Sequence, residues 1–252
     1  LKGMNKTFDI LPTDIPLEKA TFKRLKIDYE KKTNLKFEEK DFISFGLVTN
    51  NNVLTYAGAL LADEDLVYQS RVFCTRWNGL TKSGGLMEAL ADEEFEGNIL
   101  YLLQYAVDFV RVNTRKMWRR GELYREEYPE YPMRAVKEAI VNALIHRDYS
   151  VIGSEVHVDI FDDRMEITSP GGMYDGTFIQ DKDPYTISSS RRNPILADIF
   201  GRMELMERRG SGLKKIIESY EFERNYKESL KPEFISTRST FCTILKNLNY
   251  NF

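Results

Sequence analysis

The sequence predicts an α+β fold in which helices lie on one face of a mixed sheet in the second half of the chain, preceded by a smaller α+β region. Three observations predict it. Residues 95–114 place apolar side chains at helical spacing. Residues 133–146 form a second helix that combines apolar and polar positions. Directly after it, the alternating run 155–161, the turn 162–164 and the run 165–169 predict a β-hairpin.

Composition limits the classes of protein that this chain can belong to. Its 252 residues are 42% hydrophobic and 30% charged, as in an ordinary globular protein. A net charge of -3 argues against non-specific nucleic-acid binding by the chain as a whole, although a local basic patch is compatible with it. Two cysteines and two histidines exclude a disulfide scaffold and a histidine-rich metal site.

The apolar runs are too short to span a membrane, and no secretory segment opens the chain. We therefore expect a cytoplasmic protein with no membrane partner. Leu1 stands where a methionine would begin a complete chain, so we expect a piece of a longer protein.

The first half is predicted to contain a few short elements besides the long helix. Residues 15–32 and 54–62 have helical spacing, and residues 71–77 read as a strand because β-branched and aromatic residues dominate them. The acidic run 92–94 is expected in a solvated loop or at a helix cap.

The polar segment 121–132 contains two prolines and is the best internal boundary. We therefore divide the chain into an N-terminal α+β region, residues 1–125, and a second domain, residues 126–252. The second domain continues beyond the hairpin with a loop to residue 194, two helices and a final strand, predicted at residues 195–205, 212–220 and 239–248.

The helix at 134–146 carries a polar stripe. Glu138, Asn142 and His146 share a face because a four-residue step turns a helix by only about 40°. Alanine and branched residues flank this stripe, so a carboxylate and an amide border a buried face and need partners. An asparagine oxygen can coordinate Mg²⁺ carried by phosphates, and a glutamate can orient or deprotonate water. The structural alternative is that Glu138 pairs with Arg147 or another basic residue and Asn142 caps a loop.

Three further segments favour a ligand site. Ser169-Pro170-Gly171-Gly172 follows a strand directly, where glycine lets backbone approach a ligand. Gly210-Ser211-Gly212 opens a helix, whose free N–H groups attract phosphate, although the same segment also fits a plain helix start. Residues 188–194 add two arginines, which suit a phosphate and equally suit solvent. The order of these segments is more informative than any one of them.

In that order the chain resembles a known family. The segments EAIVNALIHRDYS (138–150), DDRMEITSPGG (162–172), SSRRNPILADIF (189–200) and ERRGSGLKKI (207–216) resemble the HATPase-like domain of bacterial AlbA–HATPase proteins. These are labelled transcriptional regulators or RecG-related ATP-binding proteins. Residues 7–114 are similar to the stretch that precedes that domain. An AlbA-like, nucleic-acid-binding domain commonly lies upstream in the family, so contact with DNA is expected only through neighbouring domains.

The family is a distant relative of the GHKL ATPases, so the resemblance implies a GHKL-like (Bergerat-type) α/β sandwich that binds ATP and Mg²⁺. It implies that Glu138 is the catalytic base and that Asn142 binds the metal and the nucleotide. Ser169 replaces the aspartate that reads adenine in GHKL proteins, and a serine can accept the same hydrogen bond without charge. The other nucleotide-binding candidates are Gly171 and Gly172 on the adenine side and Arg191, Gly210, Ser211 and Gly212 on the phosphate side.

Three functions follow from the resemblance. The chain could be an ATP-responsive regulatory module that switches conformation when loop 171–194 closes over the phosphates. It could be a slow ATPase in which Glu138 activates water. It could also be a degenerate scaffold that makes protein contacts without nucleotide. The sequence leaves a homo-oligomer open.

The segment His146-Arg147-Asp148 also resembles the catalytic loop of protein kinases. That motif requires an asparagine where Gly153 stands, and no glycine-rich GxGxxG loop is present. A kinase is therefore rejected.

Overall fold

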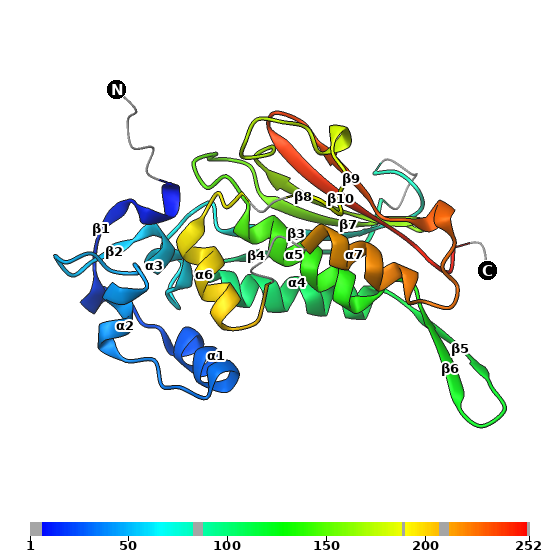
Figure 1. Ribbon diagram of the computed structural model, residues 1–252, viewed down its shortest axis with the longest axis horizontal. Helices are drawn as coiled ribbons and strands as arrows, with labels where there is room; N and C mark the ends of the chain where they lie inside the picture. The colour runs from blue at the N-terminus through cyan, green and yellow to red at the C-terminus, as the bar shows by residue number, and fades with distance from the viewer. Residues whose placement is uncertain (1–6, 83–87, 188–189, 207–211, 251–252) are drawn as a thin grey trace.

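A mixed six-stranded sheet forms the centre of the molecule (Figure 1). The computed structural model describes residues 7–82, 88–187, 190–206 and 212–250. The strands lie in the order β4-β3-β7-β8-β10-β9, and within this sheet β3 and β7 pair in parallel while the other neighbours pair antiparallel. Their bounds are β3 (Arg71–Trp77), β4 (Ala89–Glu96), β7 (Val156–Ile160), β8 (Arg164–Pro170), β9 (Glu233–Ser236) and β10 (Thr240–Lys246). The predicted α+β class is confirmed.

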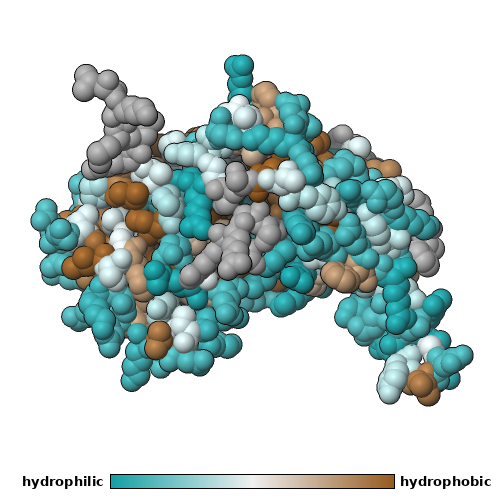
Figure 2. Space-filling model, viewed as in Figure 1, coloured by the Kyte–Doolittle hydropathy of each residue, from teal (hydrophilic) through white to brown (hydrophobic). Residues whose placement is uncertain are grey.

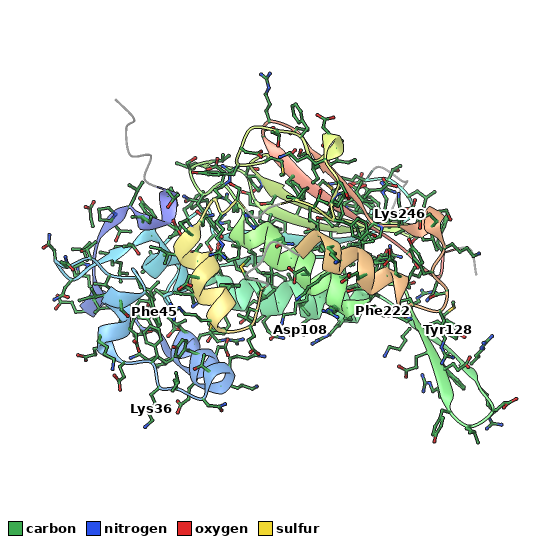
Figure 3. The ribbon with its side chains drawn as sticks, viewed as in Figure 1. Lys36, Phe45, Asp108, Tyr128, Phe222 and Lys246 are labelled. Atoms are coloured by element: carbon green, nitrogen blue, oxygen red, sulfur yellow. The ribbon has the colours of Figure 1, made fainter. Side chains whose placement is uncertain are left out.

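Three helices lie along one face of this sheet, as Figure 1 shows. They are α4 (Ile99–Asn113), α5 (Met133–Ile145) and α7 (Gly212–Glu221). Val156, Val158 and Ile160 of β7 are buried, because alternate residues of a strand face the same side and here meet the helices. Asp108 of α4, labelled in Figure 3, lies on the side of the helices away from the sheet, where its side chain is half exposed. The predicted placement of helices on one face of a mixed sheet is confirmed.

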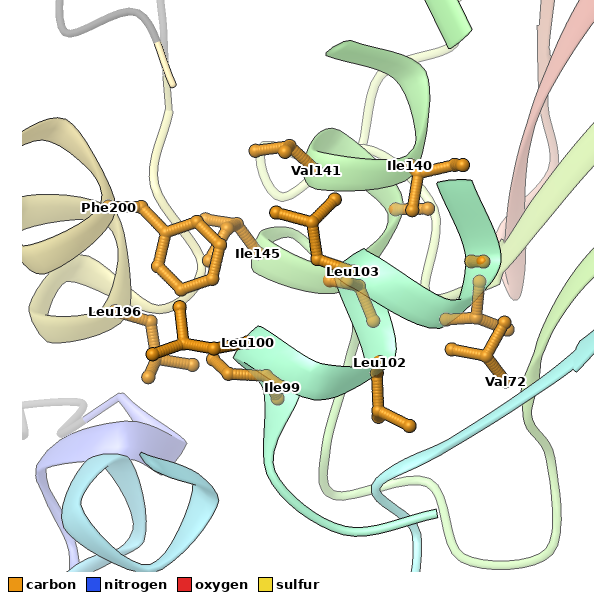
Figure 4. Packing of buried hydrophobic residues seen from close by; sticks show 14 of the residues in the cluster. Val72, Ile99, Leu100, Leu102, Leu103, Ile140, Val141, Ile145, Leu196 and Phe200 are labelled. Atoms are coloured by element: carbon orange, nitrogen blue, oxygen red, sulfur yellow. The ribbon is translucent and has the colours of Figure 1, made fainter. Parts of the chain in front are cut away.

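The hydrophobic core runs from the sheet through these helices into α6 (Pro194–Arg202). Figure 4 shows Leu103 of α4 near Ile140 and Val141 of α5, and Ile145 beside Phe200 of α6. Each such side chain, once buried, stabilises the fold by roughly 1.5–3 kcal/mol. The core and the sheet both join residues from either side of position 125, and a division of the chain there stays a prediction.

The N-terminal elements pack against the end of the sandwich near α6 (Figure 1). The buried Asp9 carboxylate accepts hydrogen bonds from the amides of Ile195 at 2.7 Å and Leu196 at 3.3 Å, at the start of α6. Since a carboxylate at a helix start satisfies amides that lack helical partners, Asp9 acts as a distant cap. The elements are η1 (Phe8–Ile10), β1 (Pro12–Pro16), η2 (Leu17–Lys19), α1 (Lys23–Thr33), α2 (Glu39–Ser44), β2 (Val53–Thr55) and α3 (Tyr56–Leu61).

Three segments differ from the prediction. The helix expected over residues 15–32 begins only at Lys23, because β1 reaches Pro16 and η2 follows it. The acidic run 92–94 lies in strand β4, paired with β3, rather than in a loop or cap. Backbone pairing with the apolar strand β3 outweighs the low strand propensity of acidic residues, and charged residues are common on an edge strand. The polar boundary 121–132 contains part of a hairpin, β5 (Lys116–Arg120) and β6 (Arg125–Pro129).

The remaining short elements are η3 (Ile179–Asp181) and η4 (Glu228–Leu230). Among the helices described here, none is both long and apolar enough to cross a bilayer.

Candidate functional site

A pocket of roughly 350 Å³ lies between α5, the start of α7, strands β8 and β10 and the loop after β8. This volume is in the range of small-molecule sites. Apolar side chains make up much of the wall that the described residues form, including Ala139, Ala143, Ile167, Leu213 and Phe241. Polar groups are concentrated at its two ends.

At one end, two polar side chains of α5 meet the start of α7. Glu138 and Asn142 are one helical turn apart and line the pocket together with Gly212, the first residue of α7. A Cβ atom at Gly212 would lie 2.8 Å from Oε1 of Glu138 and 3.0 Å from Nδ2 of Asn142. Only glycine therefore leaves this corner open, where a helix start attracts negative charge.

The inner wall of the pocket contains Ser169, near the end of β8. Its side chain is buried, and Oγ donates a hydrogen bond to the carbonyl oxygen of Ala143 at 2.7 Å. This bond uses the only proton of the hydroxyl, while the oxygen keeps capacity to accept. Thr243 of β10 is also buried and lines the same wall.

The second polar end contains His146, the Pro-Gly-Gly turn and Arg192. Gly171 has a φ of +98°, and a Cβ there would lie 2.8 Å from Cβ of Asp148, so the turn requires glycine. Arg192 donates from Nη1 to Oδ2 of Asp148 and from Nη2 to the carbonyl of Gly172, both at 2.8 Å. These two bonds hold the end of the loop after β8 against its own start at Gly172 and against Asp148, which follows α5.

The imidazole of His146 faces this end and is neutral at physiological pH. Burial, together with the positive charges of Arg192 and Arg191, lowers the pKa of His146 to about 4. It can therefore donate or accept a hydrogen bond, but it brings no positive charge to the pocket.

The structure gathers most of the candidate residues in this one pocket. Six of them line it, namely Glu138, Asn142, Ser169, Gly171, Gly172 and Gly212. Gly210 and Ser211 lie outside the described residues.

Arg191 stays a prediction: Arg192 is the arginine among the described lining residues, while the positive charge of Arg191 also acts on His146. Asp148 and the carbonyl of Gly172 hold the Arg192 guanidinium at the wall.

Sequence reasoning did not single out the wall formed by β10. Phe241 and Thr243 both line the pocket, and their spacing of two within a strand-like run was the available signal. Their distance along the chain from α5 gave no reason to bring them to this site.

The residues at the first polar end fit a metal that arrives with a ligand better than a resident metal. Within the described part of the chain, no three His, Cys, Asp or Glu residues are grouped to hold an ion. Mg²⁺ in nucleotide sites is held largely by phosphate oxygens and water, with only one or two protein ligands. The oxygens of Asn142 and Glu138 in an open corner suit that arrangement.

Comparison with known proteins relates this fold to one family. Residues 153–245 match the family described as "Putative ATP-dependent DNA helicase recG C-terminal". The match covers β7 to β10, including Ser169 and Gly212, and it supports a RecG-related, HATPase-like assignment for this part of the chain. No curated protein matches.

A solved structure shares the fold over nearly the whole chain. The DIP2311 protein from Corynebacterium diphtheriae superimposes with a TM-score of 0.75 and 20% sequence identity. The superposition covers 96% of this chain and 48% of that protein, so this chain spans about half of its length. At this identity the likeness shows a common fold alone.

Proposed function

We propose that this chain binds ATP with Mg²⁺ in the pocket between α5, α7 and the sheet, as a nucleotide-dependent switch within a transcriptional regulator. One observation carries the proposal: Glu138, Asn142 and the glycine start of α7 converge at one end of a pocket whose wall also carries apolar side chains, among them Ile167 and Phe241. The family match, whose description names an ATP-dependent protein, supports it.

The two parts of the pocket suit the two parts of a nucleotide. A purine ring would pack against Ile167 and Phe241, and the phosphates would extend toward Gly212. There the first amides of α7 would bind phosphate oxygens, and Asn142 would hold Mg²⁺. Bound Mg²⁺ neutralises part of the phosphate charge.

Ser169 favours adenine over guanine. Its proton is already donated to the carbonyl of Ala143, so toward a ligand its oxygen can only accept. The amino group of adenine is a donor, whereas guanine carries an acceptor at that position. ATP should therefore bind more tightly than GTP, although Ser169 lacks the charge of an aspartate.

A switch requires contacts that differ between two conformations. The loop after β8 supplies Met173, Tyr174, Ile187 and Arg192 to the pocket wall, so a bound nucleotide would contact it directly. We propose that nucleotide stabilises this loop against α5 and α7, and that the longer protein responds to that state.

Slow hydrolysis is the second candidate function. The carboxylate of Glu138 lines the phosphate end, the position from which a general base can activate water. Glu138→Gln keeps the size of the side chain but removes the base. If the chain is an ATPase, this variant should bind ATP and release no phosphate. Unchanged phosphate release would exclude Glu138 as the base.

The proposal is tested by calorimetric titration with a non-hydrolysable ATP analogue in Mg²⁺, beside Asn142→Ala and the matched variant Asn113→Ala on α4. Asn113 donates to the carbonyl of Phe109, within its own helix. Saturable binding that Asn142→Ala abolishes and Asn113→Ala retains supports the site. Absence of binding at millimolar nucleotide contradicts it and favours the scaffold without nucleotide.

A further inference from the structure

The hairpin of β5 and β6 projects from the body of the molecule as a two-stranded arm (Figure 1). A two-stranded ribbon is marginally stable alone, so cross-strand contacts have to hold it. Glu126 accepts from Nε of Arg119 at 2.5 Å and pairs with Nη1 of Arg224 at 2.7 Å. These cations, with the hydroxyl of Tyr128, lower the pKa of Glu126 to about 2.

The two faces of the arm differ. Cross-strand partners share a face, and neighbours along a strand alternate between faces. Arg119, Glu126 and Tyr128 share the face that contacts Arg224 of the body. The opposite face carries Lys116, Trp118, Arg120, Arg125 and Glu127.

That opposite face combines positive charge with an exposed aromatic ring. Trp118 is 58% exposed, and the guanidinium carbon of Arg125 lies 4.6 Å from its ring centroid. Glu127 is the carboxylate on this face and is shared by Lys116 at 2.7 Å and Arg125 at 3.7 Å. Arg120 is exposed as well, so cations outnumber carboxylates here.

The positive charge of this face contrasts with the net negative charge of the chain. Residues 116–129, the two strands and their turn, contain four Arg or Lys and three Glu, whereas the whole chain has a net charge of -3. Figure 2 shows the arm as a mainly hydrophilic projection with a hydrophobic spot at its end. One face of the arm, with Lys116, Arg120 and Arg125 beside the exposed Trp118, is therefore a local basic patch.

We propose that this arm binds single-stranded nucleic acid. The phosphates would lie against Lys116, Arg120 and Arg125, and a base would stack on Trp118. Single strands are bound by positive grooves or ribbons with exposed aromatic rings, because every base offers a face for stacking. The Arg125 guanidinium lies over one face of the indole and is itself a planar group on which a base can stack. The site does not depend on the nucleotide pocket and stands if that proposal fails.

A lipid surface fits the arm less well. The end of the hairpin carries Glu122 beside Leu123 and Tyr124, which are 85% and 82% exposed. If the arm approached an anionic membrane with the end of the hairpin first, the negative charge of Glu122 would be among the first groups to meet the membrane surface. The cations Lys116 and Arg120 instead lie along the length of a strand, which suits a linear polyanion.

The proposal is tested by fluorescence anisotropy of a labelled oligothymidine of about 20 bases, titrated with the full chain at low and rising salt. Arg120→Glu and Trp118→Ala should each weaken binding by about fivefold or more. Lys31→Glu makes the same charge change on α1, at the other side of the molecule in Figure 1, and should leave binding unchanged. The log–log salt slope of Arg120→Glu should become shallower by about 0.7 for each phosphate that the variant no longer binds.

Four results would overturn the proposal. They are absence of binding by the unaltered chain, equal weakening in Lys31→Glu, tighter binding of a duplex of the same length, and unchanged binding in Trp118→Ala. Sedimentation with anionic vesicles and analytical ultracentrifugation test the other occupants of the arm. If Arg120→Glu abolishes vesicle binding or self-association while the oligonucleotide does not bind, a membrane or a second copy is the partner instead. Urea unfolding of each variant verifies its fold.

Discussion

Replacing Gly212 with alanine should separate nucleotide binding from stability. The new Cβ would lie 2.8 Å from Oε1 of Glu138 and 3.0 Å from Nδ2 of Asn142, both closer than ordinary van der Waals contact. These atoms end flexible side chains and can turn aside. Because alanine also favours a helix over glycine by about 0.5–1 kcal/mol, the free energy of unfolding should change by less than about 1 kcal/mol.

Binding should change far more, because both polar side chains leave their positions at the phosphate end. Removal of such polar interactions costs about 1–3 kcal/mol, which corresponds to a Kd raised roughly 5- to 150-fold. Calorimetry with the ATP analogue and Mg²⁺ measures the Kd, and urea unfolding measures stability. Lys214→Ala, at an exposed position of the same helix, should leave both unchanged. A folded Gly212→Ala chain that binds like the unaltered protein would refute the role assigned to this corner.

Three other substitutions test the pocket and its support. Ser169→Ala leaves the carbonyl of Ala143 without its donor, so urea unfolding should show a loss of about 1–3 kcal/mol and ATP should lose its advantage over GTP. The pKa of His146 is about 4, against an ordinary value of 6.5, so folding favours the neutral ring. The free energy of unfolding should therefore fall by up to about 3 kcal/mol as pH drops from about 6.5 to about 4. His146→Gln should flatten this pH profile. An equal effect of His157→Gln would contradict the assignment of the pH dependence to His146. Burial raises the pKa of Asp9, so the folded state favours the protonated carboxyl group. This contribution to the free energy of unfolding is fully present below the ordinary pKa of 3.8 and is lost as pH rises through the folded pKa. Asp9→Asn should gain stability relative to the unaltered chain as pH rises, and a relative loss in urea unfolding would contradict this.

Much of the fold could be predicted from local patterns. The helix at 133–146 and the hairpin after it have strong periodicity, and β3 is rich in β-branched and aromatic residues. The acidic strand β4 and the arm were not predictable in this way. Acidic residues pair with β3 because that strand offers an edge, and the arm depends on cross-strand charge pairs that no local pattern shows.

The candidate site was predictable only in part. The four-residue spacing of Glu138 and Asn142 placed both on one face of a helix, and the structure places both at one pocket. The place of Arg192 at the wall depends on Asp148, a partner more than forty residues away that no local pattern indicates. The wall from β10 depended on sheet order, which the sequence does not encode locally.

The parallel pairing of β3 with β7 has a consequence for folding and for the use of fragments. Val72 lies opposite Val156, so this seam closes only after the intervening chain has been synthesised. Long-range pairing of this kind slows folding, because loop-closure entropy is lost before the contact forms. The segment 153–245, expressed alone, would leave β7 as an open edge with the apolar faces of Val156 and Val158 uncovered. Such an edge is a template for aggregation, so biochemical work on this protein should retain β3 and α4.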